Sequence, residues 1–507
     1  MNKLKLPLLL GVLVMFASCK KFLDVNDNPN APVNVPVEQL LPGALISSAN
    51  IESGALNQLG AVWTGYWAKA VDGPSTVSLF RLEETYAVKA MSFDRDGRPF
   101  WEDIYKILTN YKNIETKASA DGDLVYAGIA KIMQGWHFMR LVDLYNNVPF
   151  EEAIQGTVYA TPRFEDGKRV YDNSVNLITK GIDDIKNATV LSKKPAADDI
   201  VFKGALTKWI RFANTIKLRA LLRQSQAGDN AYINTEIAKI IAEGTGFLTD
   251  GESALVDPGF LVTAGKQNPL WETYYRNPQG ALTAGYNTLR PTAFVVDQYK
   301  ATNDPRLVKL YARPKGGGDY KGVPLGTDAG IYSMDNTSAL MGPVENGNQP
   351  GAIFKSAVSP IVLMGSFESL FLQAEAAQRG WINSSARVLY ETAVKESFKY
   401  MEVPDSEYDG YIVQPLVDYD NAPNKIERII VQKWMALNSL SSIEAWNDYR
   451  RLGYPSNLPQ SLASPNSNLD YRPLRLTYRQ SEISGNAAEV EKQGNIDPFV
   501  SRVFWDK

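Results

Sequence analysis

Apolar residues recur every three or four positions over most of the chain after residue 40, which is the spacing of one face of an α-helix. Alternation with a period of two is scarce and short. The clearest helical stretches are residues 100–108, 206–224, 367–379 and 438–451. Gly453 and Pro455 follow the last stretch and favour a helix end there. The pattern therefore predicts a mainly α-helical fold.

Residues 367–398 fit the spacing of a tetratricopeptide helix pair. If Ala374 is the small residue of the first helix, Ala386 and Ala393 are the small residues of the second and Tyr390 is its aromatic residue. The break between the helices is expected at residues 380–384. Because small residues let two antiparallel helices approach closely, we expect such helix pairs to form a scaffold.

Two long segments interrupt the helical pattern, residues 312–360 and 452–474. Both are rich in residues that favour turns, such as Gly, Pro, Asn and Ser. Loops of this length on a rigid body are unusual unless they bind a ligand or cover a partner. We therefore expect them to contribute to a ligand face.

The chain begins with a short apolar run over residues 6–16 that follows two lysines and ends at small residues before Cys19. Eleven residues are too few to span a bilayer, which takes about 20, but suit a secretory signal. The run resembles a bacterial lipobox, in which the cysteine is acylated and becomes the first mature residue, although Phe16 stands where leucine is usual. The alternative is an ordinary signal that leaves Cys19 a free thiol. We expect a signal at residues 1–18, a lipidated tether at 19–39 and one domain at 40–507.

Composition excludes several kinds of site. Cys19 is the only cysteine, so a lipidated chain has no thiol for a disulfide, a metal or catalysis. The single histidine, His137, lies in an apolar stretch and is predicted to be a core residue. A net charge of −3 without a basic run argues against nucleic-acid binding. We find no catalytic signature and expect no cofactor or metal.

Several stretches in a fixed order resemble the SusD/RagB family of surface lipoproteins, and more closely its second SusD-like branch. The resemblance covers nearly the whole chain. Asn147 stands where the family often has glycine. The matching stretches are residues 19–26, 40–44, 140–149, 209–219, 371–381, 429–437, 444–451, 453–455, 497–499 and 503–507.

This resemblance implies a single helical domain whose tetratricopeptide-like pairs contact a SusC-like TonB-dependent outer-membrane transporter. It also implies loops that bind a nutrient, usually an oligosaccharide and sometimes a peptide, and hand it to the transporter. The protein would not be an enzyme. It would lie at the outer membrane, anchored only through its lipid and facing the exterior.

Sugar capture needs aromatic rings for the C–H faces of a pyranose, beside side chains that pair with hydroxyl groups. A Pro- and Gly-punctuated region between predicted helices offers both. Its candidate ligand-binding residues are Trp271, Tyr274, Tyr275, Arg276, Tyr286 and Arg290. Arg81 is a further candidate, from an earlier cluster that also contains Phe80 and Tyr86. The rings of Trp63, Tyr66 and Trp67 have helical spacing and are predicted to be core.

Other functions remain open from the residues alone. A peptide binder of the same family, a lipid-anchored glycoside hydrolase and a scaffold that binds only its barrel partner are the alternatives. A hydrolase would need paired carboxylates, for which Glu83–Glu84, Glu102–Asp103 and Glu151–Glu152 are available. Adjacent carboxylates are more typical of a solvated helix face, which is how we interpret these.

Overall fold

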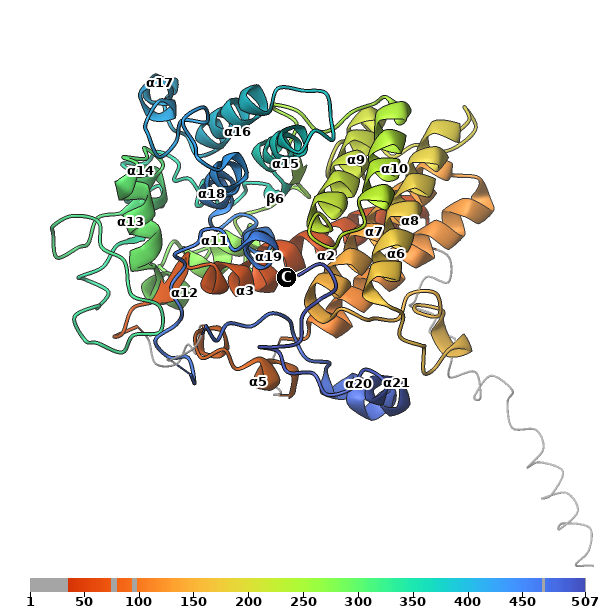
Figure 1. Cartoon of the computed structure of the whole chain (residues 1–507), viewed down its shortest axis with the longest axis horizontal. Coiled ribbons are helices and arrows are strands. Elements are labelled where there is room, and N and C mark those ends of the chain that lie inside the picture. The colour runs from red at the N-terminus through yellow and green to blue at the C-terminus, as the bar shows by residue number, and fades with distance from the viewer. Residues whose placement is uncertain (1–34, 74–79, 94–97, 467–469, 507) are drawn as a thin grey trace, which may run out of the picture.

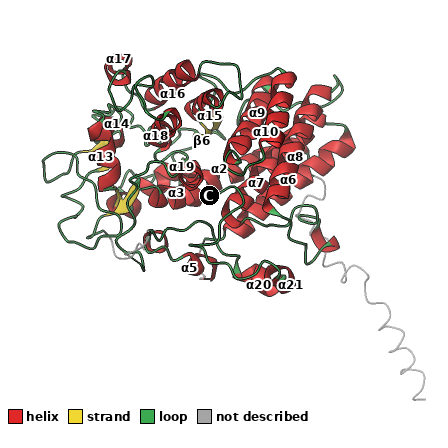
Figure 2. Cartoon of the chain, viewed as in Figure 1, coloured by secondary structure: helices red, strands yellow, loops and turns green. Residues whose placement is uncertain are grey.

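The computed structural model describes residues 35–73, 80–93, 98–466 and 470–506. The predicted signal, Cys19 and nearly all of the predicted tether lie outside the described residues. The described chain is mainly helical, as predicted, with a few very short strands (Figure 2). The helices pack around an extended common core. Long loops form the left end of the view, the loop end, and further loops run along its lower edge (Figure 1).

A bent helix begins the described fold. It runs through α2 (Val37–Ile51), a π-helical turn (Glu52–Leu56) and α3 (Asn57–Trp63). Gly54 has non-helical backbone angles inside the turn, which shifts the register between the two flanking helices. All seven residues of α3 are buried. This segment therefore lies in the interior, between the helix pairs and the loops.

Long helices form one side of the molecule (Figure 1). On this side α7 and α8 pack closely, because Gly128 and Gly181 face each other. A β-carbon placed at Gly128 would lie 2.5 Å from the carbonyl oxygen of Gly181, so both positions require glycine for the helices to approach. The helices on this side are α6 (Phe100–Asp121), α7 (Leu124–Tyr145), α8 (Gly167–Asn187), α9 (Leu206–Arg223) and α10 (Asn230–Glu243).

The predicted tetratricopeptide pair is present as α15 (Ser366–Gln378) and α16 (Ala386–Tyr400). Ala374, Tyr390 and Ala393 are fully buried, and the Tyr390 ring contacts the Phe371 ring edge-on at 6.1 Å between centroids. The chain leaves α15 through Gly380, whose positive φ of 74° suits a residue without a β-carbon. This confirms the helix pair that the spacing predicts.

A second pair consists of α18 (Lys425–Leu437) and α19 (Ser442–Leu452). The predicted helix at residues 438–451 is wrong at its start. The segment before α19 turns at Ser439, which has a positive φ of 65°, and the Asn438 amide donates instead to the Tyr311 hydroxyl at 2.7 Å. Tertiary hydrogen bonds thus prevail over helical spacing at this end.

The described residues contain three antiparallel two-stranded sheets, of which the one with β6 lies beneath α15 (Figure 1). The paired strands are β1 (Trp67–Lys69) with β3 (Leu289–Pro291), β2 (Ala254–Val256) with β6 (Ile361–Met364), and β4 (Tyr311–Ala312) with β5 (Ala339–Leu340). The short helices are α4 (Arg81–Glu84), α5 (Val88–Phe93), α11 (Pro269–Tyr274), α12 (Ala284–Thr288), α13 (Ala293–Ala301), α14 (Leu307–Leu310), α17 (Tyr408–Ile412), α20 (Gln480–Gly485) and α21 (Ala487–Glu491), with 3₁₀ turns at Gly156–Val158 and Asp405–Glu407. Among the described residues, no helix is both long and apolar enough to cross a membrane.

Charged side chains, not only apolar ones, join the helices at the centre. The Glu444 carboxylate on α19 lies 2.6 Å from Arg140 on α7, 3.4 Å from Arg219 on α9, and in contact with Arg223 on α9. These guanidinium groups hold the pKa of Glu444 well below its usual range despite its burial. We call this set, with Glu52 and Asp143 that also pair with its arginines, the ion-pair cluster: Glu52, Arg140, Asp143, Arg219, Arg223 and Glu444.

His137 is a core residue, as predicted. It is fully buried on α7, and its Nε2 lies 2.8 Å from the Ser48 hydroxyl on α2. Burial, with a smaller effect of the nearby Arg140 charge, lowers the pKa of His137 to about 3. The imidazole is therefore neutral inside the fold.

Candidate functional site

The predicted aromatic region begins at α11, which starts with an ordered cap. The Asn268 side chain accepts the backbone N–H groups of Leu270 and Trp271, and Pro269 occupies the first helical position. This cap fixes the direction in which Trp271 leaves the backbone. The Trp271 ring is half-buried and meets the Tyr275 ring edge-on, with 4.6 Å between centroids.

Tyr275 is the centre of this region. Its ring is completely buried and stacks on Phe354 at 5.0 Å, nearly parallel. Its hydroxyl donates to Glu345 Oε2 at 2.8 Å and accepts the Val344 N–H at 3.1 Å. A β-carbon at Gly342 would come within 2.2 Å of the ring, so glycine there makes room for it. We call Trp271, Tyr275, Tyr286 and Phe354 the ring cluster, since Tyr286 also meets Tyr275 at 5.3 Å.

The Arg290 side chain hydrogen-bonds to backbone carbonyl groups inside the fold and does not face the surface. Its buried guanidinium donates to the carbonyl oxygens of Tyr286 at 3.0 Å and Leu289 at 2.6 Å, and to the Thr337 hydroxyl at 3.1 Å. Burial lowers the pKa of Arg290 to about 10. It therefore ties α12 and β3 to the loop around Thr337.

Tyr274 faces away from the ring cluster. It is buried, donates to the Gln58 side chain at 2.7 Å and meets Trp67 edge-on at 5.1 Å. Trp67 in turn contacts Phe80, the residue before Arg81. Arg81 is exposed on α4. The Trp67 and Phe80 rings therefore link Tyr274 to the chain segment that contains Arg81.

Arg276 joins the ring cluster from the side. Its guanidinium lies over the Tyr275 ring at 5.0 Å, donates to the Gly280 carbonyl at 2.5 Å and lies 3.8 Å from Glu345. It is half-buried. Of the seven predicted ligand-binding residues, Trp271, Arg276 and Arg81 therefore have surface that a ligand can reach, while the others are buried behind them.

The surface beside Trp271 is hollowed but small. Trp271, Lys355 and Tyr400 line a hollow of about 30 Å³, the space of roughly one water molecule. Lys355, Tyr400 and Glu396 line an adjoining hollow of about 390 Å³. The Trp271 ring consequently borders a narrow hollow that shares Lys355 and Tyr400 with the larger one.

The other aromatic and carboxylate patterns have structural roles. Trp63, Tyr66 and Trp67 are buried, which confirms their predicted place in the core. The interpretation of Glu83 and Glu84 as a solvated face is wrong. Both are buried because each has a cation within reach, Arg98 at 2.6 Å from Glu83 and Lys69 at 3.0 Å from Glu84. Within the part of the chain that the structure describes, no group of three His, Asp or Glu side chains could hold a metal ion.

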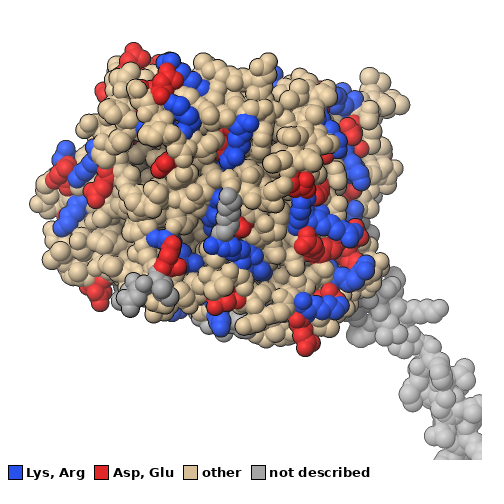
Figure 3. All heavy atoms as spheres, viewed as in Figure 1, with Lys and Arg blue, Asp and Glu red and all other residues tan. Residues whose placement is uncertain are grey.

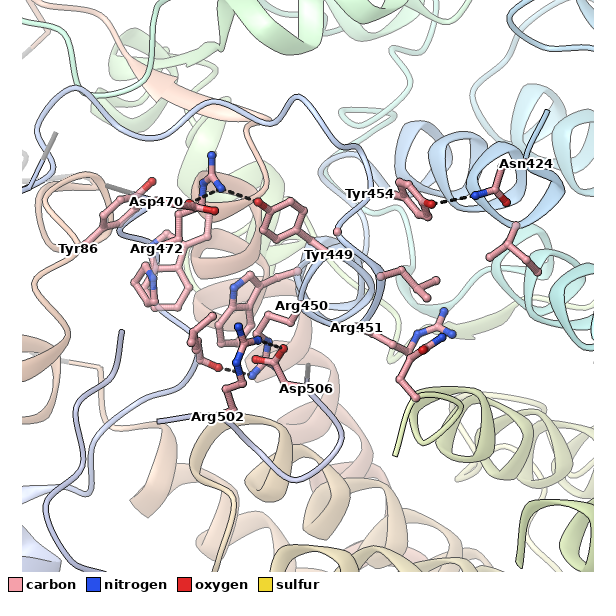
Figure 4. Close-up of a pocket in the computed structure, with 18 of the residues that line it drawn as sticks. Tyr86, Asn424, Tyr449, Arg450, Arg451, Tyr454, Asp470, Arg472, Arg502 and Asp506 are labelled. Carbon is pink, nitrogen blue, oxygen red and sulfur yellow. Dashed lines mark hydrogen bonds and ion pairs between the residues drawn. The ribbon is translucent and has the colours of Figure 1, made fainter. Parts of the chain in front are cut away.

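A separate cavity of about 620 Å³ opens where α19 ends, and the sequence analysis missed it. Figure 4 shows Tyr449 and Arg472 on one side, Arg450, Arg502 and Asp506 in the middle, and Arg451 with Tyr454 on the other side. We call it the arginine cavity. Tyr449, Arg450 and Arg451 are consecutive, so a row of ring and guanidinium groups at the end of a helix is the signal that could have found it.

Arg450 is unusual among these groups. It lies between the rings of Trp446, 3.5 Å away, and Trp505, 4.6 Å away. It donates only to neutral oxygens, the Leu474 carbonyl at 2.7 Å and the Asn447 amide at 2.5 Å. Burial without a bound carboxylate lowers the pKa of Arg450 to about 9.

The described residues thus form a helical scaffold with two ring-lined hollows and the arginine cavity. The sequence profile of the SusD-like_2 family, described as "Starch-binding associating with outer membrane", matches residues 29–479. The chain therefore belongs to this family, whose members are non-catalytic outer-membrane nutrient-binding proteins. No curated protein sequence matches it.

Solved structures agree with this fold. A chitin-binding SusD homologue from Flavobacterium johnsoniae is 24% identical with a TM-score of 0.73, covering 92% of this chain and 98% of that one. A SusD homologue from Bacteroides fragilis is 21% identical with a TM-score of 0.72, covering 94% and 100%. A SusD-like protein from Bacteroides thetaiotaomicron is 22% identical with a TM-score of 0.71, covering 93% and 99%.

Proposed function

We propose that this protein is a surface lipoprotein, anchored through Cys19, that binds an oligosaccharide and delivers it to a SusC-like TonB-dependent transporter. Membership of the family supports the nutrient-binding role. The chitin-binding homologue of the same fold supports a carbohydrate as the nutrient. The lipobox-like run before Cys19 supports the anchor.

The observation that carries the carbohydrate proposal is the half-buried Trp271 ring, held at a fixed angle by the buried Tyr275 ring. An immobilised ring can accept the C–H face of a sugar without losing further side-chain entropy. Arg276 would donate to hydroxyl groups of the sugar, while Tyr275, Tyr286 and Arg290 support the Trp271 surface from behind. Arg81, on the other side of Tyr274, would contact a ligand that extends beyond Trp271. Trp271 is the residue of this set on which affinity should depend most.

Calorimetry with neutral oligosaccharides, chitin fragments among them, tests the site. Replacing Trp271 by Ala should weaken binding by about 1–3 kcal/mol, the usual cost of removing one stacking ring. Trp381→Ala is the matched control, because Trp381 is also a half-buried tryptophan, on the turn after α15. Unchanged affinity of the Trp271 variant would overturn this site, and binding of peptides in place of glycans would identify the peptide-binding alternative.

The anchor and the transporter need a separate experiment. Cys19→Ser should release the protein from the outer-membrane fraction of cells that lack the barrel partner, without changing its melting temperature. Purification of the lipidated protein should recover a TonB-dependent barrel alongside it. Continued membrane fractionation of the serine variant would contradict the anchor, and glycan binding without any barrel would contradict delivery.

A further inference from the structure

The arginine cavity has the size of a ligand site. Its volume of about 620 Å³ falls within the range of roughly 300–1,000 Å³ that is usual for small-molecule pockets. It lies between α19, the segment around Arg472 and the C-terminal segment around Arg502. Basic side chains lie near the centre of the face on which α19 ends (Figure 3).

Four of the five guanidinium groups that line this cavity have a carboxylate partner. Arg472 pairs with Asp470 at 2.6 Å and Arg502 with Asp506 at 2.8 Å. Arg379 and Arg451 both pair with Glu375, at 2.8 and 2.5 Å. Arg450 is the exception, since among the described residues its hydrogen bonds go to neutral oxygens, although the Asp506 charge lies close enough to offset part of the lowering of its pKa by burial. Arg451 also pairs with Asp448 at 2.9 Å. The five arginines of the lining therefore outnumber by one the four carboxylates that pair with them.

Buried donors in the lining are also unsatisfied. The Nε–H groups of Arg450, Arg451 and Arg472 have no acceptor among the described residues. Arg450 and Arg451 are only 5% and 2% exposed. A buried donor without an acceptor is costly, more so on a charged group, so an incoming oxygen anion would relieve that cost.

Two rings complete the lining. Tyr449 and Tyr454 at the end of α19 are half-buried, so part of each ring faces the opening. Their hydroxyls are held in place, by Arg472 at 2.5 Å for Tyr449 and by Asn424 at 2.8 Å for Tyr454. Fixed rings beside guanidinium groups suit a ligand with a sugar ring and a carboxylate, because a guanidinium binds the planar carboxylate in bidentate fashion.

We propose that the arginine cavity is a second carbohydrate subsite, selective for a carboxylated sugar such as a uronate. The carboxylate would contact the guanidinium groups around Arg450, and the sugar ring would lie on Tyr449. This inference rests on the proposed carbohydrate-binding function and extends it to acidic glycans. It is distinct from the Trp271 surface, whose cations Arg276 and Lys355 already lie near Glu345 and Glu402.

The direct test uses calorimetry of the full chain with a galacturonate trisaccharide and its methyl ester. Esterification removes the negative charge and leaves the ring, so it should weaken binding by at least about tenfold, the usual effect of losing one charge-assisted hydrogen bond. Added salt should weaken binding of the acid more than that of the ester. Equal affinity for acid and ester would overturn the proposal.

Variants assign the binding to this cavity. Arg450→Gln removes the central charge, but its packing between two tryptophans makes folding a separate question. Arg502→Gln is therefore the second variant, since Arg502 is exposed and pairs with a carboxylate four residues on. Arg387→Gln is its matched control, with the same i,i+4 pairing to Glu391 on α16.

We expect Arg502→Gln and Tyr449→Ala to weaken galacturonate binding about tenfold, while Arg387→Gln does not change it. If Arg502→Gln and Tyr449→Ala bind galacturonate as the parent does, the acidic subsite is elsewhere and the proposal fails. If Trp271→Ala reduces binding of neutral glycans in the same series, the proposed function still stands. If no glycan of either kind binds, both proposals fall together.

Discussion

The ion-pair cluster is buried, and so is the ring cluster apart from Trp271, yet the two hold the protein together in different ways. The ion-pair cluster joins α7, α9 and α19 through carboxylates and guanidinium groups. The ring cluster joins α11, α12 and the loop at Phe354 through aromatic contacts, with one tyrosine hydroxyl at its edge. The first is the centre of the helical scaffold and the second is the support of a surface.

This difference indicates which part of the molecule depends on paired charges for its stability. A buried charge that loses its partner costs several kcal/mol, so the scaffold depends on each member of its cluster. Aromatic packing is spread over many weak contacts, so the loop end should respond to a single lost group by a smaller amount. Ion pairs thus stabilise the helical scaffold, while aromatic packing stabilises the proposed ligand-binding surface.

The largest effect should come from Glu444→Gln. This change removes the negative charge that contacts Arg140, Arg219 and Arg223 and leaves three buried guanidinium groups short of a partner. We expect the free energy of unfolding to fall by about 3–5 kcal/mol, measured by chemical denaturation. Glu391→Ala is the control on the surface, with an expected change of about 0–1 kcal/mol. Similar losses for the two variants would contradict the comparison.

The next effect concerns pH and His137. Because its pKa is about 3 in the fold and its ordinary value is 6.5, only the unfolded chain takes up this proton between those values. Stability should therefore fall with decreasing pH, by about 1.4 kcal/mol per pH unit below pH 6.5. His137→Gln should remove this slope between about pH 6 and 5, as followed by denaturation at each pH. A slope that persists in the variant would show that other groups cause it.

Below about pH 4.5 the ion-pair cluster should add to this loss. The pKa of Glu444 is lowered in the fold, so its contribution is present above the ordinary value of 4.5 and is lost as pH falls toward the folded value. Glu368 opposes this effect, since burial raises its pKa. Glu444→Gln should accordingly show a shallower loss of stability with acid than the parent.

The smallest effect should come from Tyr275→Phe in the ring cluster. The ring and its stacking on Phe354 remain, while the hydrogen bonds to Glu345 and Val344 are lost. We expect a loss of about 1 kcal/mol in the free energy of unfolding and no change in its pH dependence. A loss as large as that of Glu444→Gln would show that the loop end depends on polar contacts as much as the scaffold does.

The helices were largely predictable because their spacing reflects packing along one face. The pair formed by α15 and α16 follows directly from small residues such as Ala374 and Ala393. The start of α19 was not predictable, since Asn438 donates to a tyrosine distant in the sequence. Local spacing contains no information on such partners.

The candidate site was predictable only in part. The sequence shows that aromatic residues are concentrated around Trp271, but it does not show which rings face solvent, and Tyr274 and Tyr275 are buried. Arg290 was expected to meet a ligand, but its donors go to carbonyl groups. The arginine cavity combines α19 with residues as far away in the sequence as Trp63 and Arg502, so only the folded chain brings them together.

The crossing of α3 and α19 restricts which substitutions this sequence can tolerate. A β-carbon at Gly60 would lie 2.3 Å from the backbone of Ser442 and Ile443, so no side chain of any size fits between the two helices. Both helices would have to separate to admit even alanine. Among related chains that keep this geometry, whatever nutrient they take, the position of Gly60 should therefore vary less than the loops that contact the ligand.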